Sequence, residues 1–150
     1  MSLKKWFLAL VCLTTFTAQA AEQNQPLILE SKYDFSKTLD ILESTFKEKG
    51  MTLFTRIDHQ AAAKAQGLEM QPATVIIYGT PKVGTPLMIK DPTLALQLPL
   101  KVLVTEPEQG KVEVMLNSAE QVVARSNTSY SEVENTLAKA EKLIRATIAK

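Results

Sequence analysis

Residues that bind metals or form covalent cross-links are scarce in this sequence. Its 150 residues include one Cys and one His. A structural zinc site typically needs four Cys or His ligands, and a disulfide framework or a multi-histidine site also needs several of these residues. The composition therefore excludes these classes of protein, and we expect neither a bound metal nor a cofactor.

Neither sign of charge is in excess. The chain carries 17 Lys and Arg against 16 Asp and Glu, a formal net charge of +1. Nucleic acids and acidic membranes attract proteins through a strongly basic surface, so no nucleic-acid partner is expected. The 45% hydrophobic and 22% charged residues are instead typical of a soluble globular protein, and the length is typical of one domain.

Residues 1–20 have the pattern of a secretory signal peptide. Lys4 and Lys5 precede the apolar run 6–13, and Ala18 and Ala20 provide the small residues that signal peptidase requires. The apolar run is shorter than the roughly 20 residues of a membrane-spanning helix. We expect cleavage after Ala20 and release into the periplasm without a stable membrane anchor. A short permanent anchor is the alternative.

Cleavage would remove Cys12, the only cysteine. The remaining chain would form no disulfide, iron–sulfur cluster, cysteine nucleophile or c-type haem attachment. It would carry 15 Lys and Arg against 16 Asp and Glu, a net charge of −1. A chain of this length still buries about two thirds of its unfolded surface, so it needs no cross-link to fold.

Helical and strand patterns alternate along residues 27–150, after a flexible lead-in at 21–26. Strands are expected at 27–33, 51–57 and 73–78, with a hairpin over 100–116. Helices are expected at 35–49, at 59–66, from Pro86 to 96 with an interruption at Asp91-Pro92, from the capping box at Ser118, and over 131–148 from a second capping box at Ser131. The order predicts one α+β domain, in which helices cover one face of a mostly antiparallel sheet.

Five short segments occur in the order found in a known family: 50–54, 57–63, 79–81, 84–88 and 98–102. They include the Asp-His pair followed by alanines, a Gly-x-Pro step, a Gly-Thr-x-Leu-Met segment and a Leu-Pro step. Over residues 27–148 the chain resembles the family called domain of unknown function 302. Gln97 stands where that family often carries Asp. The resemblance implies a compact α+β domain and supplies no activity.

His59 is the first candidate for proton transfer or ligand contact, because imidazole ionises near neutral pH. Three interpretations stay open. The ring can hydrogen-bond a loop carbonyl while Asp58 caps the following helix, it can contact a ligand, or it can act as a general acid or base. Met51, Met70, Met88 and Met115 together with His59 could form a soft copper site, although methionine more often fills a core.

The segment 79–85 is expected to be a loop that positions Thr80, Lys82 and Thr85. It lacks the Lys-Ser/Thr ending of a phosphate-binding loop, so its glycines are read either as turn residues or as part of an anion site. We expect this loop to border one pocket together with Asp58 and His59. The sequence has no Gly-x-Ser-x-Gly or Ser-x-x-Lys motif that would activate a serine nucleophile.

These observations favour a noncatalytic periplasmic domain that binds an unidentified small ligand or a protein partner, with Asp58, His59, Thr80, Lys82 and Thr85 as candidate contacts. The alternative is a small periplasmic enzyme that uses His59 as general acid or base. A homodimer is left open.

The leader predicts that the exported protein begins at Ala21. Intact-mass measurement of the secreted chain checks this. A different first residue would move the cleavage site, and retention of Met1 would contradict export with cleavage.

Overall fold

The computed structural model describes residues 25–149, so the predicted leader and most of the lead-in lie outside the described residues. Within this range five strands form one antiparallel sheet in the order β1-β5-β4-β3-β2. The strands are β1 (Leu27–Glu30), β2 (Thr52–Asp58), β3 (Ala73–Gly79), β4 (Leu100–Glu108) and β5 (Lys111–Leu116).

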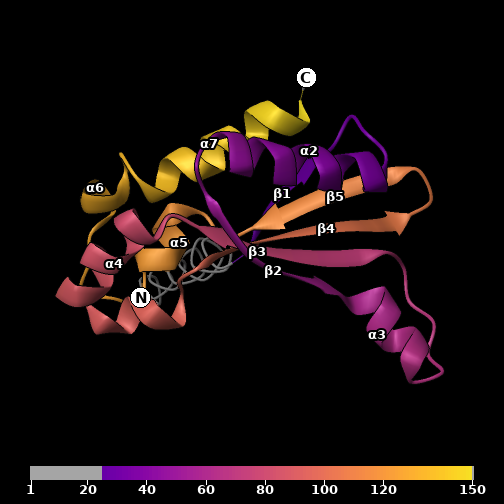
Figure 1. Ribbon diagram of the computed structural model, residues 1–150, viewed down its shortest axis with the longest axis horizontal. Helices are drawn as coiled ribbons and strands as arrows, with labels where there is room; N and C mark the ends of the chain where they lie inside the picture. Colours follow the sequence, from indigo (N-terminus) through magenta and orange to yellow (C-terminus); the bar gives the residue numbers. More distant parts are fainter. Residues whose placement is uncertain (1–24, 150) are drawn as a thin grey trace, which may run out of the picture.

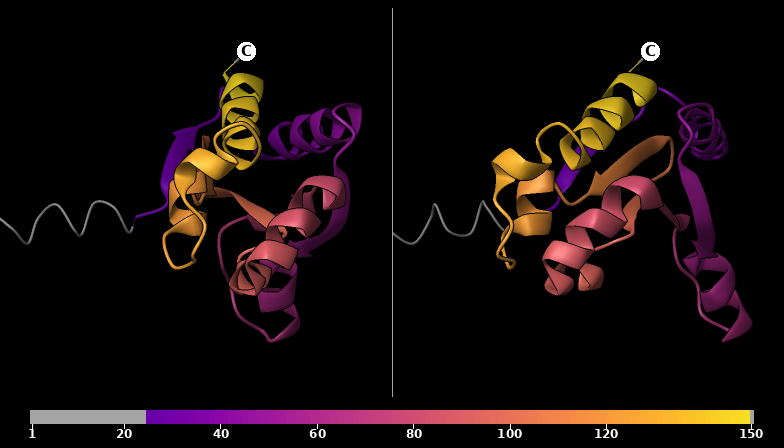
Figure 2. Two further views of the ribbon diagram at one scale, coloured as in Figure 1. Left: turned by 90° about the vertical axis from the view of Figure 1, so that its left-hand side faces the viewer. Right: turned by 60° about the vertical axis from the view of Figure 1, so that its left-hand side comes forward.

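Helices pack on one face of the sheet and at one of its ends (Figures 1 and 2). They are α2 (Phe35–Glu48), α3 (His59–Ala65), α4 (Pro81–Lys90), the 3-10 helix η1 (Pro92–Leu96), α5 (Ala119–Val123), α6 (Tyr130–Val133) and α7 (Leu137–Ile148). Helices α2 and α7 lie side by side across the sheet, whereas α3 projects away from it. The predicted α+β class, with helices on one face of an antiparallel sheet, is confirmed. No helix among residues 25–149 is long and apolar enough to cross a membrane.

The main core lies between the sheet and the helices α2 and α7. Alternate residues of the strands point to this side, because successive side chains of a strand face opposite ways. On this side of the sheet the helices contribute Leu39, Leu42 and Phe46 from α2 and Ile144 from α7. The Phe46 and Tyr78 rings stack with their centroids 4.1 Å apart and their planes 7° apart. This stack joins α2 to β3.

Helix α2 begins and ends where the sequence predicts. Asp34 is its N-cap, and its carboxylate accepts a hydrogen bond from the Lys37 amide at 2.8 Å. Gly50 follows the helix with a φ of 71°, a conformation that strains residues with a Cβ. The chain can therefore turn directly into β2.

A second apolar cluster fills one end of the molecule. It brings η1, α5, α6 and the start of α7 together with side chains of α4. Its buried members are Leu94, Ala119, Val122, Val123, Val133, Leu137 and Ala138. Helix α5 begins at the predicted capping box, in which Ser118 and Gln121 each bond the other's backbone amide.

The prediction of a loop over 79–85 is wrong, because α4 begins at Pro81 rather than Pro86. Proline at the first helical position has a suitable φ and lacks an amide that would be unpaired there anyway. Pro86 lies inside the helix and gives up the bond to the Lys82 carbonyl. The packing of Leu87 and Met88 on the second cluster compensates for this loss. The predicted interruption at Asp91 is confirmed.

The prediction of one helix over 131–148 is also wrong, because the segment forms α6 and α7 with a break at 134–136. The second capping box is formed by Ser129 with Glu132, two residues earlier than expected. The break lets the short α6 pack on α5 while α7 lies across the sheet. The apolar stripe of α7, formed by Leu137, Ala140, Ile144 and Ile148, is nevertheless buried.

Ile144 tests this packing because its side chain is 0% exposed in the main core. We expect Ile144→Ala to lower the free energy of unfolding by about 2–5 kcal/mol, as for other truncations that leave a cavity. Urea unfolding measures the change. Ile89→Ala, at a position of α4 that is 78% exposed, is the matched control and should change stability little. Equal effects of the two substitutions would show that the stripe of α7 does not form the core.

Candidate functional site

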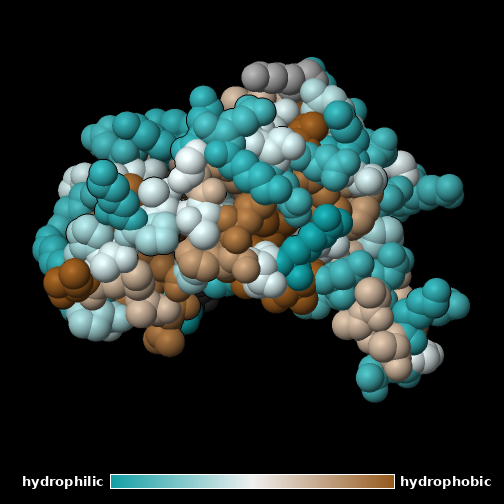
Figure 3. Space-filling model, viewed as in Figure 1, coloured by the Kyte–Doolittle hydropathy of each residue, from teal (hydrophilic) through white to brown (hydrophobic). Residues whose placement is uncertain are grey.

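A pocket of about 560 Å³ opens where the start of β2, the end of β3, α4 and the start of α7 meet. Its wall is formed largely by apolar side chains. These are Met51, Phe54, Tyr78, Pro81, Val83, Met88, Leu98, Pro99, Leu100, Leu137 and Ala140. The space-filling view shows apolar surface beside β2 (Figure 3). Pockets of this size and lining commonly hold small organic molecules.

An irregularity in β2 places an aromatic ring in this pocket. The register between β2 and β3 shifts between Leu53 and Thr55, so Phe54 has no paired residue on β3. Its ring remains 48% exposed. A Cβ on Gly79 would lie 3.6 Å from Cε2 of Phe54, so the ring lies close over the glycine. Bulges often redirect a side chain toward a functional site in this way.

Polar groups lie around the apolar wall. Thr80 and Thr136 are the N-cap residues of α4 and α7, and neither side chain caps its helix. Thr85 and Asn135 also line the pocket, as do Lys49 and Lys139. No Asp or Glu is among the lining residues described in 25–149. The charged groups of the pocket are therefore positive.

Tyr78 is the most deeply buried polar residue of the pocket. The residue is 1% exposed, and its hydroxyl forms no hydrogen bond with any part of the chain between residues 25 and 149. Since no fully buried side-chain oxygen in this range lacks a partner, the small exposed part of Tyr78 includes its hydroxyl, which is open to the pocket. Burial raises the pKa of Tyr78 far above its usual value, and the carboxylate of Glu141 raises it further. The hydroxyl therefore stays protonated, and it can donate a hydrogen bond.

The expected site residues do not border one pocket. Thr80 and Thr85 line the pocket described above, but Lys82 is exposed on α4 and is not among its lining residues. Asp58 and His59 lie at the other end of β2. Since Thr52 pairs with Gly79 and Asp58 pairs with Thr74, the full length of β2 separates the two groups. The expectation of one shared pocket is therefore wrong.

Asp58 acts as the N-cap of α3, and its carboxylate accepts a hydrogen bond from the Ala61 amide at 2.9 Å. Together with Gln60 and Lys64 it lines a separate hollow of about 610 Å³. His59 is exposed at the first position of α3, and within the described range its ring has no hydrogen bond or ion pair. Nothing in this geometry places a second polar group beside the imidazole.

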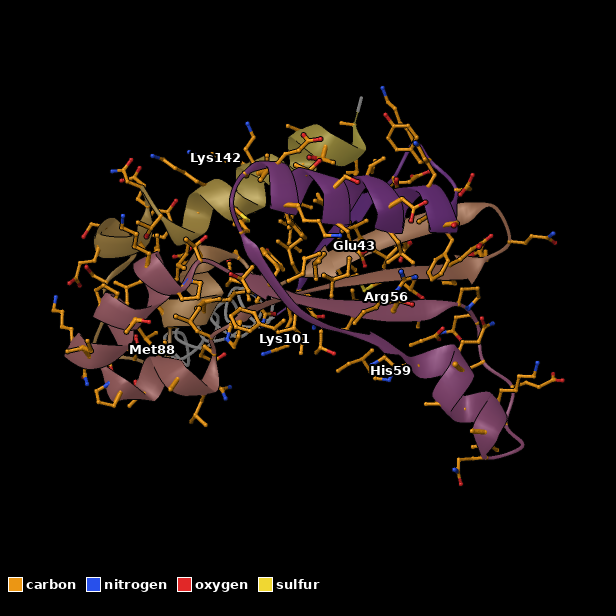
Figure 4. The ribbon with its side chains drawn as sticks, in the orientation of Figure 1. Glu43, Arg56, His59, Met88, Lys101 and Lys142 are labelled. Carbon is orange, nitrogen blue, oxygen red and sulfur yellow. The ribbon has the colours of Figure 1, made fainter. Side chains whose placement is uncertain are left out.

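The four methionines considered for copper do not gather around His59. Met88 and His59 lie far apart in the molecule (Figure 4). Met51 and Met88 line the main pocket, Met70 lines the hollow beside α3, and Met115 lies in β5. Among residues 25–149 there is also no group of three or more His, Cys, Asp or Glu that could hold a metal ion.

Sequence reasoning missed three parts of the pocket: Phe54, Tyr78 and the segment 135–140. The bulge that turns Phe54 outward has no marker in the sequence. Residues 135–140 were expected inside one continuous helix, so the start of α7 was not recognised as part of the pocket wall. Tyr78 did carry a signal, because a tyrosine at the end of a buried strand needs a hydrogen-bond partner for its hydroxyl.

Asp91 holds the α4 wall of the pocket against the rest of the fold. The residue is 4% exposed, and one of its carboxylate oxygens accepts hydrogen bonds from the Thr93 amide and hydroxyl at 3.1 and 2.6 Å. The other accepts from the Asn127 amide at 2.7 Å and the Thr128 hydroxyl at 3.2 Å. The junction of α4 and η1 is thereby tied to the segment that joins α5 to α6.

Comparison with known proteins gives a family match and a fold match. The family model described as domain of unknown function DUF302 matches residues 27–149. The crystal structure of the uncharacterized conserved protein DUF302 from Bacillus stearothermophilus superposes with a TM-score of 0.70. The superposition covers 84% of this chain and 97% of that one at 16% sequence identity, and at this identity it shows the fold alone.

Two curated relatives are named fluoride-specific ion channel FluC 1, one from Brucella suis biovar 1 (strain 1330) and one from Brucella abortus biovar 1 (strain 9-941). Each is 36% identical to this chain over 103 residues, which is 69% of this chain. The match covers 41% and 38% of the two relatives. The chain therefore spans about two fifths of the length of these proteins.

The Asp91 network predicts a pH dependence of stability. The Thr93 hydroxyl, with the Asn127 amide, holds the pKa of Asp91 below its usual value despite burial. A lowered pKa in the folded state stabilises the protein above the unfolded-state pKa of about 3.9. This contribution is lost as the pH falls through the lower folded-state pKa.

We therefore expect Asp91→Asn to lower the melting temperature at pH 7, and the difference from the unmodified chain to shrink as the pH falls from about 5 to 2. Thermal unfolding across this range measures it. Asp40→Asn, at an exposed position of α2, is the matched control. A difference that stays constant with pH would show that the Asp91 carboxylate does not titrate with a lowered pKa in the folded protein.

Proposed function

The chain belongs to the DUF302 family, a domain of unknown function, and we propose that it binds a small, largely apolar molecule in the pocket between β2, β3, α4 and α7. The observation that carries this proposal is the pocket itself. It combines about 560 Å³ of space with apolar side chains from four elements and a few polar groups at defined positions. Binding sites for small molecules have this composition.

The wall of the pocket comes from elements that are fixed elsewhere. Tyr78 is held by its stack on Phe46, and the α4 wall is held by the Asp91 hydrogen bonds. Leu137 and Ala140 belong to the buried face of α7. A wall of this kind keeps its shape without a ligand, and a preformed site avoids the entropic cost of ordering on binding.

In this proposal the protein acts after export, as the leader pattern of residues 1–20 predicts. Its role is binding rather than catalysis. The alternative, an enzyme with His59 as general acid or base, has less support because His59 lies at the far end of β2 from the pocket. A general base must reach its substrate by a hydrogen bond or through one water molecule.

Fluoride conduction is not part of this proposal. The relatives that carry the channel name are matched over 38–41% of their length. Their name describes the whole protein, and the larger part of each lies outside the matched stretch. A small domain of this family can therefore occur within a larger protein, and we propose that its contribution there is also the binding of a small molecule.

The test uses the neutral fluorescent probe N-phenyl-1-naphthylamine, which gains fluorescence in apolar surroundings. We expect saturable binding with one site per chain. Gly84 lines the pocket, and a Cβ there would meet only Leu98, at 3.6 Å. Gly84→Phe should therefore fill part of the space and weaken probe binding by about tenfold or more, since an apolar pocket responds strongly to lost volume.

Ile89→Phe adds the same ring to α4 at a position 78% exposed, and it should leave binding unchanged. His59→Ala should also leave it unchanged. Melting temperatures of all variants show whether each one folds, and Gly84→Ala is a milder variant if the phenylalanine does not fit. The absence of saturable binding, or full binding by both Gly84 variants, would overturn the proposal.

A further inference from the structure

We infer that the molecule bound in this pocket is an amphiphile with a carboxylate at one end, held by Tyr78, Lys49 and Lys139. This inference rests on the proposed function and names the class of ligand. Its first support is the unpaired hydroxyl of Tyr78. No fully buried side-chain oxygen or nitrogen of residues 25–149 lacks a hydrogen-bond partner, so this unpaired hydroxyl must be open to the pocket, where water or a ligand can pair with it.

The unpaired hydroxyl defines what the ligand must supply. Tyr78 is 1% exposed and lines the pocket, so the open space beside this residue is the pocket itself. Because its pKa is raised by burial, the hydroxyl is a donor at every physiological pH. The ligand must therefore bring a hydrogen-bond acceptor. A charged acceptor forms a stronger bond than a neutral one.

The positive charge of the lining residues favours an anionic acceptor over a neutral one. Lys49 follows the end of α2 and Lys139 lies in the first turns of α7, and both line the pocket. Neither lysine has a salt bridge with any carboxylate of residues 25–149. A carboxylate would neutralise part of this charge, whereas a cationic ligand would be repelled.

One carboxylate does lie near Tyr78, and it does not supply the missing partner. Glu141 acts on the Tyr78 pKa through its charge alone. Its Oε1 lies 3.5 Å from Nε of Arg145, one turn further along α7, and this ion pair offsets its charge. Glu141 is also absent from the residues that line the pocket.

The rest of the pocket fits an apolar body. Phe54, Val83, Met88 and Leu98 line it from β2, α4 and the segment before β4. Phe54 offers a large apolar contact surface, and Met88 can adapt to chains of different shape because its thioether side chain is flexible and polarisable. An alkyl or aromatic carboxylate would thus place its charged end at Tyr78 and its apolar end against these residues.

Three probes with the same alkyl chain test the inference on the purified chain: dodecanoate, dodecan-1-ol and dodecyltrimethylammonium. Each is measured by displacement of N-phenyl-1-naphthylamine at pH 7.4. We expect dodecanoate to bind about tenfold or more tightly than dodecan-1-ol, as charged hydrogen-bond acceptors exceed neutral ones. Dodecyltrimethylammonium should bind most weakly. Added salt should weaken dodecanoate binding and leave dodecan-1-ol binding unchanged.

Substitutions test which side chains produce the preference for dodecanoate. Tyr78→Phe removes one oxygen and should weaken dodecanoate binding by about tenfold, with little effect on dodecan-1-ol. Lys49→Gln and Lys139→Gln should each weaken dodecanoate binding by about two- to fivefold, as expected for partly exposed charges. Lys142→Gln is the matched control, because this lysine of α7 is exposed and is not among the residues that line the pocket. It should leave all three affinities unchanged.

The outcomes separate this inference from the proposed function. Equal binding of dodecanoate and dodecan-1-ol, or full dodecanoate binding by Tyr78→Phe, would overturn the inference of a carboxylate ligand. The proposal of an apolar binding pocket would be unaffected. Failure of all three probes and of N-phenyl-1-naphthylamine would overturn the proposed function itself. Tyr78→Phe should not lower the melting temperature of the empty protein, and a lower value would show that the hydroxyl already has a partner.

Discussion

The stack of Phe46 on Tyr78 is the contact on which the pocket depends. Both rings are almost fully buried, and their centroids lie 4.1 Å apart. The stack fixes α2 to the end of β3, and this end is where the chain enters α4. Phe46 stacks on one face of the Tyr78 ring. The remaining surroundings of Tyr78 are α7 and the pocket. One aromatic pair therefore serves the core and the candidate site at once.

The antiparallel pairing of β2 with β3 explains why the main pocket and the hollow beside α3 are separate. The connection through α3 lies at one end of this pair, and the start of α4 lies at the other. A strand of seven residues spans about 20 Å at 3.3 Å per residue, so side chains at its two ends cannot share a small ligand. Asp58 and Thr80 thus belong to different sites, although both lie next to β3.

Patterns that depend on neighbouring residues were predicted well from the sequence, and features that depend on tertiary packing were not. The helix that begins at Phe35, the capping box at Ser118 and the hairpin over 100–116 follow from local spacing, and they are confirmed. The start of α4 was misplaced because either Pro81 or Pro86 can open a helix, and packing of Leu87 and Met88 decides between them. The same errors affected the prediction of the candidate site. Thr80 and Thr85 were expected from the sequence, whereas Phe54 reaches the pocket through a bulge that only strand pairing reveals.

A hydroxyl that has no partner within residues 25–149 and is open to an apolar pocket links stability to binding. In the empty protein only water in the pocket can pair with it, and phenylalanine at the same position would need no partner. Tyr78 is therefore hard to explain by packing alone, since a phenylalanine would stack on Phe46 equally well. In the proposed complex the ligand's acceptor replaces that water, so the hydroxyl adds its hydrogen bond to the bound state. Ligand binding to the folded state then raises its apparent stability. This coupling gives the tyrosine a physical role that the fold by itself does not require.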